Sequence, residues 1–373
     1  MTHLIHCADL HLSRDEREYG EAVLREILGH ARTTDALLLC GDTFDSYADL
    51  DALQGWFVEL LQQELGDSGC RVLLLPGNHE YLRAPAGVSP TGESPFARRR
   101  WGPVEVLDER PLVHLPLGDG DVVAIPHREG YADYPAWEVP PRSGSWRIVM
   151  AHAAVAGLHY LGPEEEPDGG VLDPDLFRHC QADYAALGHI HRAADERHNG
   201  VRMVFPGSAR VWRAHETGAR QVMRLQAGDG GITAEPLVLQ QAGQFRQLAL
   251  AVAPDGSCEL PAELPELQPQ DWLQLELNGV IENEQDLEAQ LPGLTARFPV
   301  RSVTVKRSGV LVLRGIRENP FVQRFEECWH ARLRAASARS ADGLPSLTRN
   351  TELLMRARTT ALREIYAVLQ DQT

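Results

Sequence analysis

Five short segments of the 373-residue chain carry side chains that could bind two metal ions. The side chains are carboxylates, one amide and imidazoles, a mixed set that suits manganese, iron or zinc better than magnesium or calcium. Two such ions, about 3.5–4 Å apart, can lower the pKa of a water and clamp a phosphoryl centre. The segments are Asp9-Leu10-His11, Gly41-Asp42-Thr43-Phe44-Asp45, Gly77-Asn78-His79-Glu80, Ala151-His152 and Gly188-His189-Ile190-His191.

The spacing of these residues suits the ends of strands. Asp9 and His11, like His189 and His191, are two residues apart, so both side chains of a pair can emerge on one face of an extended chain. Asp42 has two carboxylate oxygens and can bridge two cations. Four of the five segments directly follow an apolar run that predicts a buried strand, and α/β sheets keep their active sites at strand ends.

The elements that must position these segments alternate as they do in α/β folds. Helices are expected near residues 18–32 and 48–65, and the stretch 201–239 predicts antiparallel strands with a hairpin turn at 226–231. The other expected strands cover residues 3–7, 37–40, 72–76, 104–107, 112–115, 121–125, 147–152 and 182–189.

Each segment taken alone has a simpler explanation. Gly41-Asp42 and Gly77-Asn78 are turn signals, and one histidine after a strand, such as His152, is more often a core or surface residue. Their joint occurrence, in one order and at strand ends, favours the metal site. Asp45 has two interpretations of equal weight: it supports a metal ligand from behind, or it caps the following helix.

The series D-x-H, GD-x-x-D, GNH-E, H and GH-x-H resembles the calcineurin-like metallophosphoesterases. HCADLHLS (6–13), GDTFDS (41–46), LPGNHE (75–80) and DYAALGHIHRA (183–193) are similar to the DNA-repair exonuclease branch, which holds SbcD and YhaO. The stretch 206–220 is most similar to the YhaO side. The resemblance covers roughly residues 1–240 and implies a two-sheet α/β-β/α sandwich.

The resemblance also implies roles for individual residues. One metal would be held by Asp9, His11, Asp42 and His191, and the second by Asp42, Asn78, His152 and His189. His79 would meet the scissile phosphate. There it would either stabilise the developing negative charge or protonate the leaving 3′ oxygen, a role that suits an imidazole near neutral pH. Glu80 stands where this branch usually has aspartate, so its reach differs if it orients His79. Mn²⁺ is the first expectation for the metal, with iron or zinc as alternatives.

The net charge of −17 argues against a nucleic-acid substrate, because affinity for phosphates comes largely from lysine and arginine. Arg98-Arg99-Arg100-Trp101 combines charge with a ring suited to single-stranded DNA, although a solvated loop with Trp101 in the core is the slightly better explanation. Arg192, Arg210 and Arg213 lie close to the metal motifs and are better phosphate candidates. Weak intrinsic DNA affinity is therefore expected, so that a partner protein would have to hold the DNA.

The sequence predicts that the chain consists of three segments. Residues 1–242 would form the nuclease domain, and 243–316 a small α+β capping domain with strands LALAV, WLQLEL, VRSVTV and VLVL and a helix near 283–291. Residues 317–373 predict C-terminal helices with apolar positions three or four apart, among them Phe321, Phe325, Trp329 and Leu333. These helices either pack on their own domain or dock on a partner. The resemblance implies an SMC-like coiled-coil ATPase (SbcC/YhaN-like) as that partner, and a homodimer.

The sequence therefore predicts a two-metal DNA phosphodiesterase, a 3′→5′ exonuclease with endonuclease activity on single strands. Two alternatives stay open. A small-molecule phosphoesterase, such as a cyclic-nucleotide phosphodiesterase, would suit the acidic charge, and an ATPase adaptor would need the C-terminal helices but not the ligands. The chain has no apolar run of membrane-spanning length, no signal-peptide pattern and only scattered cysteines, so a cytoplasmic location without membrane contact is expected.

Overall fold

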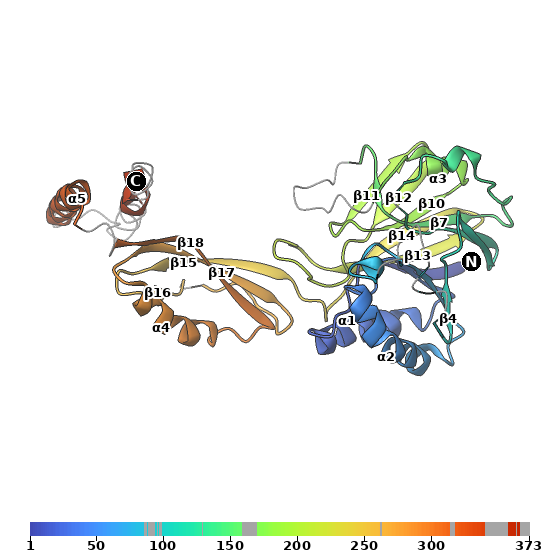
Figure 1. Ribbon diagram of the computed structural model, residues 1–373, viewed down its shortest axis with the longest axis horizontal. Helices are drawn as coiled ribbons and strands as arrows, with labels where there is room; N and C mark the ends of the chain where they lie inside the picture. The colour runs from blue at the N-terminus through green and yellow to red at the C-terminus, as the bar shows by residue number, and fades with distance from the viewer. Residues whose placement is uncertain are drawn as a thin grey trace. The chain divides into compact units, whose positions relative to one another are not determined.

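The chain divides into two compact units, Met1–Phe245 and Arg246–Thr373 (Figure 1). The computed structural model describes residues 1–85, 88, 94, 96, 99–128, 130–158, 170–261, 263–313, 318–339, 357–362 and 364–365. The boundary predicted at residue 242 lies close to this division. The second unit holds both the predicted capping module and the described part of the predicted helical segment, whose roles stay predictions.

Two six-stranded sheets build the first unit, and the predicted α/β sandwich is confirmed. The first sheet has the order β14-β13-β1-β2-β3-β4, with β14 Gly231–Val238, β13 Gln221–Gly228, β1 Thr2–Cys7, β2 Ala36–Cys40, β3 Arg71–Leu75 and β4 Val104–Val106. The second has the order β11-β12-β10-β7-β6-β5, with β11 Ala194–His198, β12 Val201–Phe205, β10 Tyr184–Gly188, β7 Arg147–His152, β6 Gly120–Ile125 and β5 Val113–Leu117. A two-stranded ribbon pairs β8 (Ala154–Val155) with β9 (Val171–Leu172).

The core of this unit is layered. One hydrophobic cluster joins residues of both sheets, such as Leu38 and Ile148, and so fills the space between them. The outer face of the first sheet packs on helices α1 (Arg17–Ala31) and α2 (Tyr47–Leu65). The outer face of the second packs on α3 (Asp175–His179) and the 3-10 turn η2 (Tyr134–Ala136), away from α1 and α2 (Figure 1). Strands buried on both faces explain the continuous apolar runs of the sequence.

Parallel pairing brings the motif-bearing strand ends together. In the first sheet β1, β2 and β3 run parallel, and in the second β7 runs parallel to β10. The carboxyl ends of parallel strands lie at one edge of their sheet, and the five segments with the predicted metal ligands begin there. The β13–β14 hairpin confirms the turn predicted at 226–231, with Gly228 opposite Gly231.

A buried ion pair joins β6 and β7 at their opposite, amino ends. The guanidinium of Arg147 donates to both oxygens of Asp121 at 2.7 and 2.8 Å, and both side chains are fully buried. Burial disfavours the ionised carboxylate, but bonds from Arg147 and the Ser143 amide hold the pKa of Asp121 well below its usual range. The pair therefore supports the sandwich far from the metal-binding edge.

Replacing Arg147 by methionine is expected to lower the free energy of unfolding by about 3–5 kcal/mol, because Asp121 would stay buried without its partner. Urea unfolding followed by circular dichroism measures this loss. Arg178→Met is the matched control, since Arg178 pairs with Asp175 at the surface and such pairs contribute about 1 kcal/mol or less. Equal losses in the two variants would contradict the prediction.

The second unit contains a four-stranded sheet in the order β16-β15-β17-β18. Its elements are β15 Phe245–Val252, β16 Cys258–Glu259, β17 Trp272–Ile281, α4 Glu284–Thr295 and β18 Ser302–Val312. Leu287, Leu291 and Leu294 of α4 pack on this sheet. The prediction of two strands, VRSVTV and VLVL, is wrong, because both belong to β18. Its pairing with β17 shifts register between Glu276 and Asn278, and a Cβ at Gly309 would lie 2.1 Å from the Asn278 side chain.

Helix α5 (Pro320–Arg339) carries part of the predicted apolar stripe. Val322 is buried, whereas Phe321 is 74% exposed, and the rings of Phe325 and Trp329 stack at 6.2 Å. Residues 340–356, 363 and 366–373 of the predicted helical segment lie outside the described residues. Within the described parts of the chain, no helix has the length and hydrophobicity required to cross a bilayer.

Candidate metal centre

The loops after β1 and β2 are joined by backbone hydrogen bonds. The amide of Asp9 donates to the Gly41 carbonyl (3.1 Å), and that of His11 to the Asp42 carbonyl (2.9 Å). Asp9, His11, Asp42 and His189 have φ angles of 54°, 45°, 49° and 92°. Such left-handed conformations cost about 1–3 kcal/mol each in residues other than glycine. The surrounding structure maintains this strain at the place where the predicted ligands converge.

Glycines in the motifs make room for the ligands. A Cβ at Gly41 would lie 2.0 Å from Nδ1 of His152, and one at Gly77 would lie 2.1 Å from Oδ1 of Asp42. A Cβ at Gly188 would lie 1.9 Å from the Cys40 carbonyl oxygen. These glycines therefore do more than form turns, because only a residue without a side chain lets the strand ends approach so closely.

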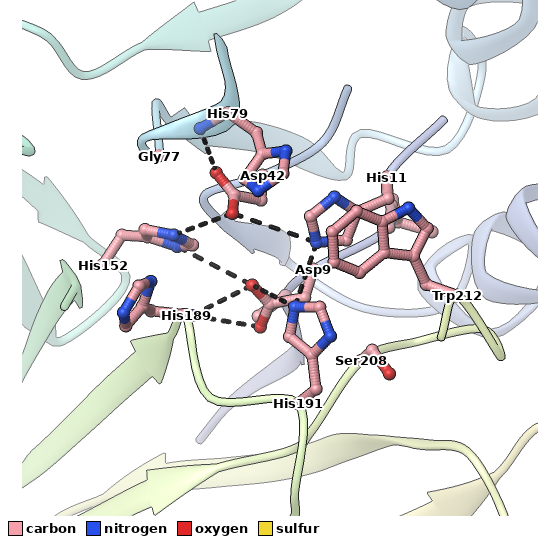
Figure 2. Close-up of polar contacts among 12 residues, drawn as sticks. Asp9, His11, Asp42, Gly77, His79, His152, His189, His191, Ser208 and Trp212 are labelled. Atoms are coloured by element: carbon pink, nitrogen blue, oxygen red, sulfur yellow. Dashed lines mark hydrogen bonds and ion pairs between the residues drawn. The ribbon is translucent and has the colours of Figure 1, made fainter. Parts of the chain in front are cut away.

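One group of predicted ligands gathers Asp9, His11 and His191 (Figure 2). Nε2 of His11 lies 3.0 Å from Nε2 of His191, and Nε2 of His191 lies 3.9 Å from Oδ1 of Asp9. The Asp9 carboxylate also accepts from the backbone amide of His189 at 3.0 and 3.1 Å. Three side chains from two strand ends thus face one point.

A second group gathers Asp42, Asn78, His152 and His189. Nε2 of His152 lies 3.2 Å from Oδ2 of Asp42 and 3.0 Å from Oδ1 of Asn78. Nδ1 of His189 lies 3.2 Å from the same Asn78 oxygen. Since Oδ2 of Asp42 is also 3.9 Å from Nε2 of His11, Asp42 stands between the two groups, as its predicted bridging role requires.

The donor atoms fit cations. Nδ1 of His152 donates to the Cys40 carbonyl at 2.8 Å. Nε2 therefore faces the Asp42 and Asn78 oxygens, and this contact is satisfied only by a proton on Nε2 or by a cation in its place. A second contact, between His11 and Asp45, is unsatisfied. Nδ1 of His11 and Oδ1 of Asp45 are 3.4 Å apart, and both atoms are buried without hydrogen-bond partners. With the proton on Nδ1, the His11 Nε2 lone pair faces His191; with it on Nε2, Nδ1 faces Asp45 unprotonated. A cation at Nε2 resolves both contacts, so the residues suit divalent metal ions.

Burial shapes the electrostatics of the metal-free site. It raises the pKa of Asp9 to about 6 and lowers that of His189 to about 3. Burial also disfavours charge on His152, but Asp42, Asp9 and the Cys40 carbonyl together outweigh it and raise the His152 pKa to about 9. Without metal, His152 and Asp42 thus pair as ions. Because histidine binds metal through neutral imidazole, metal binding must release this proton.

His79 lies beside both groups with its orientation held by two hydrogen bonds. Its backbone amide donates to Oδ1 of Asp42 (2.9 Å), and its Nδ1 donates to the Asp45 carbonyl (2.8 Å). This tautomer keeps the lone pair on Nε2. The ring lies edge-on to His11 at 4.5 Å between ring centroids.

Asp45 and Glu80 contact the site in different ways. The helix-cap interpretation of Asp45 is wrong, because Ser46 is the N-cap of α2 and accepts from the Asp49 amide. The Asp45 carboxylate faces Nδ1 of His11 instead. Glu80 is fully buried and accepts from the backbone amides of Asp42 (3.2 Å), Phe44 (3.0 Å) and Gly77 (2.8 Å). Glu80 thus joins two of the motif loops.

Two predicted DNA contacts have other roles in the structure. Arg210 is 1% exposed, and its guanidinium donates to the carbonyls of Leu10 and His11 and to Glu16. It therefore supports the His11 loop and is too deeply buried to contact a phosphate. Trp101 is 7% exposed and packs on Phe96 with ring centroids 5.0 Å apart, so it cannot stack on a base.

The remaining predicted arginines differ in their surroundings. Arg99 pairs with Asp51 at 2.9 Å, whereas Arg100 and Arg192 are exposed. The guanidinium of Arg213 lies over the ring of Trp212, 4.0 Å from its centroid. Arg98 lies outside the described residues. Near the metal groups, Arg192 and Arg213 therefore remain as phosphate candidates.

Two residues of the site were not predicted from the sequence. The ring of Trp212 lies flat on that of His11, with centroids 3.9 Å apart and planes 8° apart (Figure 2). Glu216 accepts from Nδ1 of His191 at 2.6 Å. Burial disfavours the ionised Glu216 carboxylate, but the interactions with His191 and the bond from the Trp212 amide together outweigh it and lower the pKa of Glu216. Both residues lie in the stretch 206–220, whose similarity to known sequences was the only signal.

The described geometry agrees with comparisons to known proteins. A family profile described as calcineurin-like phosphoesterase matches residues 2–193. This range contains all seven predicted metal ligands and His79, but ends before Trp212 and Glu216.

Curated relatives share different lengths of the chain. The SbcD component of nuclease SbcCD from Escherichia coli K12 is 25% identical over 353 residues, which cover 82% of this chain and 85% of that protein. The DNA double-strand break repair protein Mre11 of Methanopyrus kandleri is 28% identical over 225 residues. This match covers 55% of this chain and 48% of the Mre11 sequence. UDP-2,3-diacylglucosamine hydrolase of Pseudomonas syringae pv. tomato is 35% identical over 77 residues, only 20% of this chain, and the match spans 31% of that protein.

Proposed function

Since the chain belongs to the calcineurin-like phosphoesterase family, we propose that it is a metal-dependent phosphodiesterase that cleaves DNA, as a 3′→5′ exonuclease with endonuclease activity on single strands. The observation that carries the phosphoesterase chemistry is the convergence of the seven predicted ligands on two neighbouring groups. The choice of DNA is supported by the similarity to the SbcD component of nuclease SbcCD over 82% of the chain.

In this proposal, each group of ligands holds one divalent ion, with Mn²⁺ first and iron or zinc as alternatives. The ions would supply positive charge against the phosphate and lower the pKa of a water. Asp42 would serve both ions. His79, protonated on both ring nitrogens, would transfer the Nε2 proton to the departing oxygen and return to the neutral ring. The bond from His79 Nδ1 to the Asp45 carbonyl supports this role, because it holds the ring in one orientation.

Few cations lie near the site among the residues that the structure describes, so we expect weak intrinsic affinity for DNA. Arg210 supports the Leu10 carbonyl and Trp101 packs on Phe96. Arg192 and Arg213 therefore remain as candidate phosphate contacts close to the metal groups. A chain with a net charge of −17 gains little from counterion release. A partner that holds the DNA would compensate.

We propose an SMC-like coiled-coil ATPase as this partner, docked on the C-terminal helices. The exposed Phe321 on α5 supports this choice, because a large apolar side chain at a helix surface suits a partner's apolar helix face. The predicted capping role of the second unit and the predicted homodimer belong to the same proposal.

A small-molecule diester is the second candidate substrate. It is favoured by the acidic charge and by the 35% identity to UDP-2,3-diacylglucosamine hydrolase, although that match covers only 77 residues. The first experiment therefore offers end-labelled single- and double-stranded DNA, bis-p-nitrophenyl phosphate and cyclic AMP to the purified protein, with Mn²⁺ or with EDTA.

We expect Mn²⁺-dependent shortening of the labelled DNA. Cleavage of the small diesters with DNA left intact would support the second candidate instead. Inactivity on every substrate, despite bound metal, would favour the adaptor interpretation and would call for the same assay with the copurified ATPase.

A further inference from the structure

We infer that Glu216 is a positioning residue of the metal centre, which fixes the tautomer of His191 and holds the segment that covers His11. The inference rests on the divalent-metal site of the proposed function and is independent of the substrate. Glu216 follows the family-matched residues 2–193, so the inference comes from its contacts alone.

Glu216 receives hydrogen bonds on both carboxylate oxygens. Nδ1 of His191 donates to Oε1 at 2.6 Å, whereas the backbone amide of Trp212 and the hydroxyl of Ser208 donate to Oε2 at 2.8 and 3.3 Å. The side chain of Glu216 is 9% exposed and that of His191 is 17% exposed. The bond between them is thus short, charge-assisted and mostly shielded from water.

This arrangement sets the chemistry of His191. A carboxylate only accepts hydrogen bonds, so the imidazole proton must sit on Nδ1 and the lone pair on Nε2. Nε2 is the nitrogen that faces Asp9 and His11. A carboxylate behind a metal-binding histidine fixes the ring and makes it a stronger ligand.

The second carboxylate oxygen of Glu216 positions a residue that contacts another predicted ligand, His11. It holds the backbone of Trp212, and the ring of Trp212 lies flat on His11 (Figure 2). Behind the carboxylate, the buried Arg220 donates to Ser208 Oγ (3.1 Å) and to the His191 carbonyl (3.3 Å). Hydrogen bonds therefore link side chains of segment 206–220 to one another and to His191, beside the group of Asp9, His11 and His191.

Glutamine at position 216 cannot satisfy the same donors, although it has the same shape. If its oxygen faces His191, its NH₂ group faces the Trp212 amide, and two donors oppose each other. If its oxygen faces Trp212, the NH₂ group requires an acceptor at Nδ1 of His191. The proton would then move to Nε2, which could no longer bind a metal ion.

The test is titration of the metal-free protein with Mn²⁺, with free Mn²⁺ counted by electron paramagnetic resonance. We expect two ions bound by the wild type and, in Glu216→Gln, one of them about 10–100-fold weaker. Glu235→Gln is the matched control, because Glu235 is exposed on β14. Equal affinities in wild type and Glu216→Gln would overturn the inference and leave the proposed function intact. A wild type that binds no Mn²⁺ would overturn both.

A second measurement does not depend on the folding of a variant. In ¹⁵N NMR of the metal-free wild type, with His191 assigned by difference against His191→Gln, we expect the proton on Nδ1. A proton on Nε2 of His191 would overturn the inference whatever the variants show.

Discussion

Replacing Asp42 by asparagine is expected to remove both metal ions and to lower the rate of phosphodiester cleavage by about 10³-fold or more. Asp42 is the side chain shared by the two groups of ligands, with Oδ2 3.2 Å from His152 and 3.9 Å from His11. Metal ions supply several kcal/mol of charge stabilisation, and about 1.36 kcal/mol corresponds to a tenfold rate. The loss of about 4 kcal/mol gives the expected factor.

Asparagine is the informative substitution because it preserves the shape of Asp42. Its oxygen can still accept from the His79 amide, as Oδ1 does at 2.9 Å, while its NH₂ group replaces the oxygen between the ligands. Metal content by inductively coupled plasma mass spectrometry and cleavage of bis-p-nitrophenyl phosphate measure the outcome. The control is Asp229→Asn, in the exposed turn between β13 and β14. An Asp42→Asn protein that keeps both ions would contradict the bridging role.

The strands and the convergence of the candidate ligands were predictable because their signals are local. β2 is buried on both faces, and four of the five residues of β3 are buried; each contains an apolar run that ends just before a predicted metal-ligand segment. Polar residues directly after such runs must lie at the sheet edge. By contrast, β11 (Ala194–His198) is charged and half-exposed, and nothing in its sequence distinguishes it from a loop.

The roles of several side chains were not predictable because their partners are distant in the sequence. Arg210 donates to the carbonyl of Leu10, 200 residues away. A guanidinium that supports a loop and one that binds a phosphate have the same sequence signal. Glu216 and Trp212 show the reverse case, because neither has a characteristic spacing and only the fold brings them to His191 and His11.

Removing the side chain of His79 is expected to slow cleavage by about 10²–10⁴-fold, the contribution of a positioned general acid, while both metal ions stay bound. His79 is almost fully buried and lies beside His11 and Asp42. Because these three residues could also hold a cation together, metal content decides between the two roles. A His79→Ala protein that loses one ion would identify His79 as a ligand and contradict its proposed role in proton transfer.

His79→Asn makes the test sharper, because the amide can still donate to the Asp45 carbonyl that Nδ1 contacts at 2.8 Å. The asparagine lacks the atom that corresponds to Nε2. If Nε2 delivers the proton, His79→Asn should be as slow as His79→Ala, and His30→Ala on α1 should match the wild type. A leaving group that needs no protonation, such as p-nitrophenolate, should narrow the gap between wild type and variant. An equal loss on DNA and on bis-p-nitrophenyl phosphate would instead indicate that His79 stabilises charge on the phosphate.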